Sequence, residues 1–342
     1  MNKARITLKA MSIVALCLLL TSIADAQAQR TFVSTQGKDS SLCDSPEKAC
    51  RSISSAITKV QAGGEVVVLD SGSYQPFTVN KALTVVAPPG VHAGITTPPD
   101  NNGALISTPD TDQVILRGLT FNRTGGNAAL GHSGIVFLAS GGLHIENCVI
   151  NGFDGGIFVG GGGRLYVKDT VARNNAGSGL VVSSTIGTAR VVIDRCRFEN
   201  NGNGVFCNEL GSARLTIRDS IASDNTFAGF SARIAPTAGV VIEINIENCL
   251  ATGNQAAGIA ASNVGSGSAG TTIMSVSNTT IAHNFQGIFC GTGGIIRVSN
   301  ATITRNETGL SVGGDGNILS RGNNTVEANN ADGFFTGTFL AK

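Results

Sequence analysis

The sequence predicts an all-β protein, a solenoid in which three parallel strands form each coil of a β-helix. Three observations support this. Glycines recur every 22 to 29 residues, asparagines recur with the same period, and in the segments that lie between them apolar residues alternate with polar ones. A fixed unit with insertions of variable length is typical of stacked coils. The recurring glycines are Gly134, Gly156, Gly179, Gly204, Gly229, Gly258, Gly287, Gly309 and Gly333.

Cys148 marks a reference position in the first regular unit. In later units an asparagine follows the equivalent position by five residues, whereas the first unit has Phe153 there. Stacked side-chain amides can hydrogen-bond from coil to coil and satisfy the backbone of a turn. We therefore predict an asparagine ladder along one corner of the solenoid. Its predicted members are Asn175, Asn201, Asn225, Asn254, Asn284, Asn306 and Asn330.

Residues 1–28 predict a signal peptide, with cleavage after Ala26 or Ala28, because basic residues precede an apolar stretch that ends in small residues. We therefore expect export to the periplasm, the cell surface or the medium. No later apolar stretch is longer, so no membrane span is expected after cleavage. A net charge of +1 without a basic run argues against nucleic acid as a partner.

The mature chain divides into three predicted parts. Residues 29–64 form an N-terminal cap, in which Ile53, Ala56, Ile57 and Val60 have the spacing of an amphipathic helix that covers the open end of the core. Residues 65–333 form the β-helix, and residues 334–342 form a C-terminal tail.

With these features the chain resembles the right-handed β-helix proteins of the pectate-lyase-like superfamily over residues 64–333. The opening RTFVSTQGKDSSLCDSPEKAC resembles a narrower group of exported bacterial β-helix proteins of undefined activity. The resemblance implies right-handed coils, but the superfamily includes lyases, hydrolases, epimerases and adhesins, so it implies no single reaction. The NTD, DD, GHG, RIK and DPHD words of its enzymes are absent, and no catalytic residue is carried over.

Cys148, Cys196 and Cys249 recur in alternate coils. Adjacent strands lie about 4.8 Å apart, so these sulfurs would be about 9–10 Å apart, too far for disulfides. We interpret them as small buried apolar side chains rather than metal ligands or redox groups. Cys43 and Cys50, close together in the exported cap, are the predicted disulfide.

Charged residues alternate in sign at one outward position of successive coils. Two carboxylates two coils apart are near the spacing of an inverting glycosidase, but the cation between them would lower both pKa values. We favour a structural charge ladder. The alternative is a polysaccharide lyase in which Lys168 and Arg218 act as base and clamp, with Asp169, Asp194 and Asp219 holding Ca²⁺; otherwise no metal or cofactor is expected. The row is Glu146, Lys168, Asp194, Arg218 and Glu247.

An apolar stripe is predicted on another outward face, formed by Val136, Phe158, Val181 and Phe206. Such a stripe is either a binding surface or a surface covered by a long loop or by the C-terminal tail. The expected function is that of an exported, non-catalytic scaffold that binds a glycan or a cell-envelope or extracellular partner. The alternative is an enzyme acting on acidic polysaccharide, namely the lyase described above.

Overall fold

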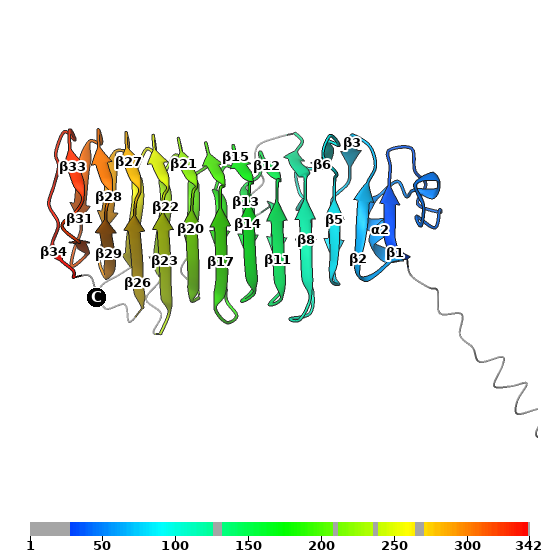
Figure 1. The fold of residues 1–342 in the computed structure, drawn as a ribbon, viewed down its shortest axis with the longest axis horizontal. Helices are drawn as coiled ribbons and strands as arrows, with labels where there is room; N and C mark the ends of the chain where they lie inside the picture. The colour runs from blue at the N-terminus through cyan, green and yellow to red at the C-terminus, as the bar shows by residue number, and fades with distance from the viewer. Residues whose placement is uncertain (1–27, 126–131, 208–210, 235–238, 264–269, 341–342) are drawn as a thin grey trace, which may run out of the picture.

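The computed structural model describes residues 28–125, 132–207, 211–234, 239–263 and 270–340 and confirms the right-handed parallel β-helix. Its coils stack along one axis, from β1 at one end to β34 at the other (Figure 1). The predicted signal peptide lies outside the described residues, apart from Ala28. No helix among the described residues has the length and hydropathy to traverse a bilayer.

Three parallel sheets form the walls of the solenoid. Sheet A contains β1 (Ala28–Val33), β2 (Val60–Val68), β5 (Leu83–Val86), β8 (Gln113–Arg117), β11 (Gly142–Glu146), β14 (Arg164–Lys168), β17 (Ala189–Asp194), β20 (Ala213–Arg218), β23 (Val241–Glu247), β26 (Thr271–Ser277), β29 (Gly294–Ser299), β32 (Asn317–Ser320) and β34 (Gly337–Thr338). Sheet B contains β3 (Gly72–Tyr74), β6 (Ala93–Thr97), β9 (Leu119–Arg123), β12 (Val149–Asn151), β15 (Val171–Arg173), β18 (Arg197–Glu199), β21 (Ile221–Ser223), β24 (Leu250–Thr252), β27 (Thr280–Ala282), β30 (Thr302–Thr304) and β33 (Thr325–Glu327). Sheet C contains β4 (Phe77–Val79), β7 (Ala104–Ile106), β10 (Ser133–Phe137), β13 (Gly155–Val159), β16 (Ser178–Val182), β19 (Asn203–Cys207), β22 (Ala228–Ile234), β25 (Ala257–Asn263), β28 (Gln286–Cys290) and β31 (Thr308–Val312).

The corner between sheets A and B is two residues long in every regular coil, and the first of them is left-handed. Asn and Asp tolerate this conformation better than other residues with a side chain, which explains why they predominate here. The sequence analysis did not identify this corner. The left-handed residues are Asn147, Asp169, Arg195, Asp219, Asn248, Asn278 and Asn300, with φ between 49° and 52°.

The second residue of the same corner explains the repeated cysteines. Cys148, Cys196 and Cys249 alternate with hydroxyl residues, and the backbone N–H of each cysteine donates to the hydroxyl of the next coil, for example from Cys196 N to Ser220 Oγ at 3.1 Å. Each thiol is buried and its Sγ donates to a carbonyl two residues earlier. The column is therefore a packing feature of the wall.

The asparagines line the corner between sheets B and C. The Asn225 Nδ2 donates to Asn254 Oδ1 at 2.8 Å and to the Phe198 carbonyl at 3.1 Å, and its own Oδ1 accepts from the Asn201 backbone at 3.0 Å. The predicted last member, Asn330, is wrong by one residue. Asn329 accepts from Asn306 at 2.9 Å, whereas Asn330 donates to Glu307 on the outside.

A helix covers the N-terminal end of the core. At the start, helix α2 (Ile53–Lys59) buries Ile53, Ala56 and Ile57 as predicted, and Ser52 caps it by accepting from Ser55 N. The Cys43–Cys50 disulfide, with 5.1 Å between Cα atoms, closes the loop before it, which also contains the short 3-10 helix η1 (Pro46–Lys48).

Two predicted boundaries differ from the structure. Strand β2 begins at Val60, inside the predicted cap, because it pairs with β1 and so already belongs to sheet A. The predicted tail contributes β34, which pairs with β32 and extends sheet A to residue 338. Phe335 packs against the core there. The C-terminal segment therefore covers the end of the solenoid and does not lie on the apolar stripe of sheet C.

Candidate functional site

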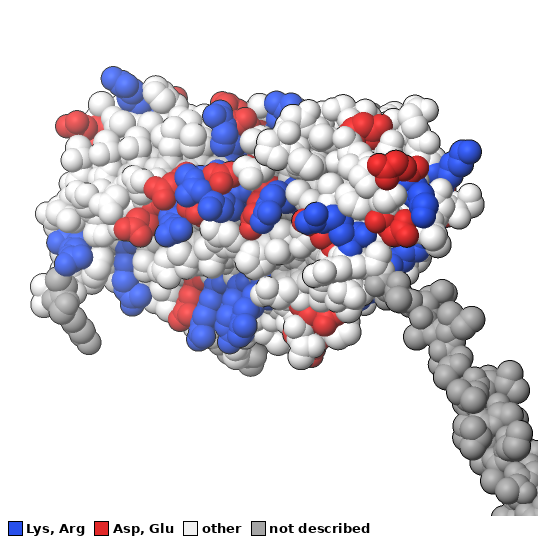
Figure 2. All heavy atoms as spheres, turned by 45° about the vertical axis from the view of Figure 1, so that its right-hand side comes forward, with Lys and Arg blue, Asp and Glu red and all other residues white. Residues whose placement is uncertain are grey.

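The predicted charge row lies on the outer face of sheet A, with its residues in direct register from coil to coil. It forms a band of alternating blue and red along the solenoid in Figure 2. The row begins one coil earlier than predicted, because Arg117 is in register with Glu146 and forms an ion pair with it at 2.8 Å. Alternating signs between neighbouring coils avoid like-charge repulsion.

Asp194 is the centre of this row and is 1% exposed. Arg218 Nε donates to its Oδ1 at 3.1 Å, and Arg195 Nη1 and the Tyr166 hydroxyl each donate to its Oδ2 at 3.2 Å. Burial alone would raise the pKa of Asp194, but the hydrogen bond and charge of Arg218, with Arg195 and Tyr166, hold the pKa below its usual value. A carboxyl in this state is a fixed anion and not a proton donor.

The structure places the residues of the lyase alternative in different environments on this face. Asp194 is committed to its two arginines, Asp169 pairs with Arg195 at 2.8 Å, and Asp219 accepts from Asn248. The predicted calcium ligands therefore do not converge, and the described residues contain no group of three His, Cys, Asp or Glu side chains that could hold a metal. Lys168 lies between Glu146 and Asp194 in the row, and no ion pair or hydrogen bond of its ammonium is found within the described part of the chain.

The apolar stripe lies on the outer face of sheet C, where its four predicted members are in register. Phe158, Val181 and Phe206 are half-buried. Val136 is only 8% exposed, so it contributes less to the surface than predicted, because its short side chain lies between the longer Leu105 and Phe158. The same column continues towards the N-terminus through Leu105 and Thr78, two residues that the sequence analysis did not include.

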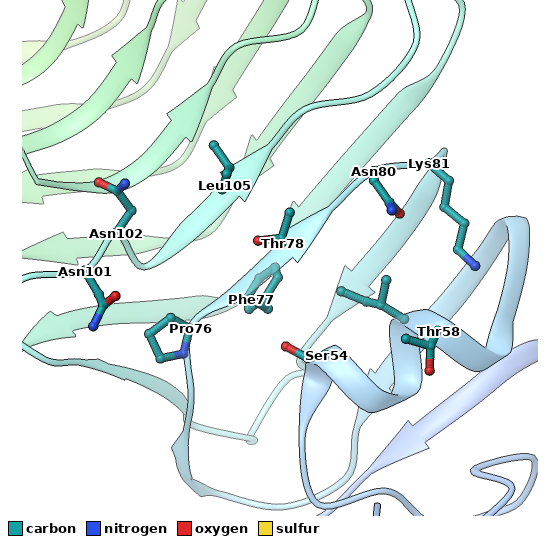
Figure 3. A pocket seen from close by; sticks show the side chains of 11 residues that line it. Ser54, Thr58, Pro76, Phe77, Thr78, Asn80, Lys81, Asn101, Asn102 and Leu105 are labelled. Atoms are coloured by element: carbon teal, nitrogen blue, oxygen red, sulfur yellow. The ribbon is translucent and has the colours of Figure 1, made fainter.

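A pocket of about 750 Å³ opens where this column meets the capping helix. Thr78 and Leu105 belong to its lining, and the polar side chains around them come from α2 and from the turns beside β4 and β7 (Figure 3). The backbone fixes part of this lining: Asn102 Oδ1 accepts from Ser133 N at 2.8 Å. The pocket thus combines amide, hydroxyl and ammonium groups with an apolar floor. Its principal polar members are Ser54, Thr58, Asn80, Lys81, Asn101 and Asn102.

A further group on sheet A escaped the sequence analysis. Arg164, Arg190 and Arg214 occupy one outward position in three consecutive coils. Each stands four residues before a member of the charge row, in the segments RLYVK, RVVID and RLTIR. The alternation that placed Lys168 outward would also have placed Arg164 outward, so the signal was present in the sequence.

Comparisons with known proteins agree with this architecture. The family model of the right-handed β-helix region matches residues 100–240. Among solved structures, the pectate lyase Pel9A is similar with a TM-score of 0.58 and 16% identity, over 91% of this chain and 77% of that chain. XylC in complex with xylose is similar with a TM-score of 0.51 and 8% identity, over 83% and 69% of the two chains.

Identities this low show a shared fold and transfer no residue roles. A search of curated proteins finds no match. The solenoid, its three sheets and these comparisons lead to one conclusion: the chain is a right-handed parallel β-helix protein with the fold of the pectate-lyase-like superfamily.

Proposed function

We propose that the protein is an exported, non-catalytic β-helix scaffold that binds a glycan or an envelope polymer on sheet C. The observation that carries this proposal is the continuity of the pocket at α2 with the outward column of sheet C, since Thr78 and Leu105 belong to both. Such a surface offers hydrogen-bonding groups at one end and a half-buried apolar track along the rest, through Phe158 and Phe206.

This combination fits a sugar chain because sugar rings have apolar faces and hydroxyl edges. Binding sites generally place a few polar groups around an apolar lining. The pocket provides amides and hydroxyls for the edges of a sugar ring, and the stripe offers apolar side chains to its faces. The mutual pairing on the charge row of sheet A supports a structural role for most of that face.

The test is a glycan array probed with the mature protein and with the double variant Phe158→Ser/Phe206→Ser. We expect the variant to lose at least about tenfold in affinity, because anchors in an interface contribute most of its binding energy. The matched control is Ile221→Ser/Leu250→Ser, which alters two half-buried outward apolar residues of sheet B in adjacent coils. Equal binding by wild type and the sheet C variant on every bound glycan would refute the proposal.

The second candidate is a lyase acting on acidic polysaccharide. The observation that favours it is the Lys168 ammonium, for which the described residues provide no ion pair or hydrogen bond, in the same row as Arg218 and separated from it by Asp194. An absorbance assay for unsaturated uronides, with and without Ca²⁺, tests it directly. Product that forms with wild type and disappears with Lys168→Ala and Arg218→Ala would establish the enzyme and displace the scaffold proposal. Absence of product across a panel of acidic polysaccharides would remove this candidate.

A further inference from the structure

A pocket of about 640 Å³ lies on the corner between sheets B and C, near the C-terminal end of the solenoid. The chain crosses this corner once in each coil, so the residue before each ladder asparagine lies on the sheet B side and the residue after it lies on the sheet C side. We name this pocket the corner groove. Its sheet B side carries His283 and Arg305, and its sheet C side carries Gln255, Phe285 and Glu307.

The asparagine ladder forms the floor of the corner groove, and the polar groups of this floor are already engaged. Asn284 Nδ2 donates to Asn306 Oδ1 and to the Ala251 carbonyl, each at 3.0 Å. The Asn284 backbone carbonyl accepts from Glu307 N at 3.1 Å. Recognition of a ligand therefore depends on the side chains that stand on the two sides of the groove.

These side chains are exposed and have few partners. Phe285 is 60% exposed although its ring is apolar. For His283 and Arg305, no side-chain hydrogen bond or ion pair is found among the residues that the structure describes. Glu307 Oε2 accepts from Asn330 Nδ2 at 2.6 Å, and within the same described ranges the carboxylate forms no ion pair with Arg305. Opposite charges thus stand on the two sides of the groove without neutralising each other.

Earlier coils show that the corner can be built without these side chains. The place of Phe285 and Glu307 is taken there by Ala176, Gly202 and Thr226. The place of Arg305 is left-handed, with φ of 55°, and earlier coils fill it with Asn174, Asn200 and Asp224. Asn and Asp tolerate this conformation better than Arg does. The corner therefore does not require an arginine or an exposed phenylalanine in order to fold.

The shape of the corner groove suits an extended peptide. The coils of β24, β27, β30 and β33 contribute to it, and with strands about 4.8 Å apart it extends for about 14 Å along the solenoid axis. Gly253 and Ala328, which have small side chains, border it on the sheet B side. An extended chain rises about 3.3 Å per residue, so about four residues fit. Consecutive side chains of such a peptide point to opposite sides, and those two residues apart point to the same side.

We propose that the corner groove binds an extended peptide segment of a partner protein in which an apolar, an acidic and a basic residue follow one another. The acidic side chain lies against Arg305 and His283, because a guanidinium is well suited to bind a carboxylate. The apolar and basic side chains are two residues apart and so lie together on the sheet C side, against Phe285 and Glu307. These two residues belong to neighbouring coils, and the flexible side chain of a lysine or arginine takes up the small difference in spacing.

The experiment is isothermal titration calorimetry of the mature full-length protein with two peptides of the same composition. The first is acetyl-Gly-Leu-Asp-Lys-Gly-amide, whose capped ends carry no charge. The second is acetyl-Leu-Asp-Gly-Lys-Gly-amide, in which a glycine between Asp and Lys turns both charges to the same side. We expect the second peptide to bind at least about tenfold more weakly, because only one of its charges can meet an opposite charge in the groove.

Protein variants test the two sides of the groove separately. Arg305→Gln should weaken binding of the first peptide at least about tenfold, whereas the matched control Arg173→Gln, at an exposed position of sheet B outside the groove, should change it less than about twofold. Glu307→Lys should reverse the preference, so that acetyl-Gly-Leu-Asp-Glu-Gly-amide binds more tightly than the Lys peptide. Circular dichroism verifies that the variants retain the fold.

Three results would each overturn the proposal: no heat of binding by wild type at millimolar peptide, equal affinity for the two peptides of the same composition, and equal losses in Arg305→Gln and Arg173→Gln. The corner groove does not rest on the glycan binding proposed for sheet C. The Phe158→Ser/Phe206→Ser protein should therefore retain wild-type affinity for the first peptide, and a loss of affinity in it would place the peptide on sheet C instead.

Discussion

Asp70 shows how a single residue fixes the first turn of the solenoid. Its Oδ1 accepts from Thr35 N at 2.9 Å and from the Tyr74 hydroxyl at 2.5 Å, and its Oδ2 accepts from Thr35 Oγ1 at 2.6 Å. Burial opposes ionisation, but these hydrogen bonds prevail and lower the pKa of Asp70 to about 2. Burial, and after it the same carboxylate, raises the pKa of Tyr74.

The depressed pKa of Asp70 predicts a loss of stability in acid. A carboxyl with a lower pKa in the folded state stabilises the protein above its unfolded pKa of about 4, and this contribution is lost as the pH falls through about 2. We expect up to about 2 kcal/mol of the free energy of unfolding to depend on this group. Denaturant titrations between pH 2 and pH 6 should show a smaller acid loss for Asp70→Asn; an unchanged slope would contradict this account.

The wall cysteines predict chemical inertness in the folded protein. Desolvation, the largest cause, raises the pKa of Cys148 and of Cys196 to about 12, so almost no thiolate exists at neutral pH. We expect these thiols to remain unlabelled by iodoacetamide in native protein and to react fully in denaturant. Mass spectrometry of labelled peptides tests this, and rapid native labelling of the Cys196 peptide would show that the wall opens.

At the scale of elements, the asparagine ladder is what joins one coil to the next at the corner between sheets B and C. Asn225→Ala would leave the Asn201 N–H and the Phe198 carbonyl buried without these partners. Each such loss costs about 1–3 kcal/mol, so we expect a decrease of about 3 kcal/mol in the free energy of unfolding. Asn245→Ala, at an exposed position of β23, is the control and should change little. Equal effects of the two substitutions in urea titrations would show that the ladder adds no stability.

The ladder also shows how far the sequence predicts the structure. Period and alternation were enough to place the coils, the capping helix and the outward columns, because these depend on patterns that repeat many times. Asn330 was misplaced because two asparagines adjoin at 329–330, and only the hydrogen bonds distinguish them. The row of Arg164, Arg190 and Arg214 was missed, although the alternation that places Lys168 outward also places these three residues outward. The pocket could not be predicted, because it joins α2 to strands that are distant in the sequence.

For the whole molecule, the ends of the solenoid are where stability and solubility are decided, since each coil is covered only by its neighbours. At the C-terminal end, Thr336 N donates to the Ile318 carbonyl at 2.8 Å and Phe339 N donates to the Ser320 carbonyl at 3.0 Å. These contacts cover the edge of β32, and unpaired strand edges promote association.

Deletion of residues 334–342 should therefore increase self-association. We expect the apparent mass in size-exclusion chromatography with light scattering to rise with concentration more steeply than for the intact chain. The control is Phe334→Ser, which alters a side chain that is 74% exposed and leaves the strand pairing of β34 intact. A truncated protein that behaves like the intact one would show that β32 does not need this cover.

The two-residue corner between sheets A and B has a consequence for how such a chain can vary. One residue added there would turn every following side chain of the strand to the opposite face. The connections from sheet C to sheet A differ already, from three residues at 291–293 to seven at 264–270. From β12 to β31 the connections from sheet B to sheet C have three or four residues, so new peptide in these coils is accepted most readily at the edge between sheets C and A. Consecutive inserts there would emerge side by side at the strand spacing. The fold is therefore suited to displaying a row of loops, one from each coil.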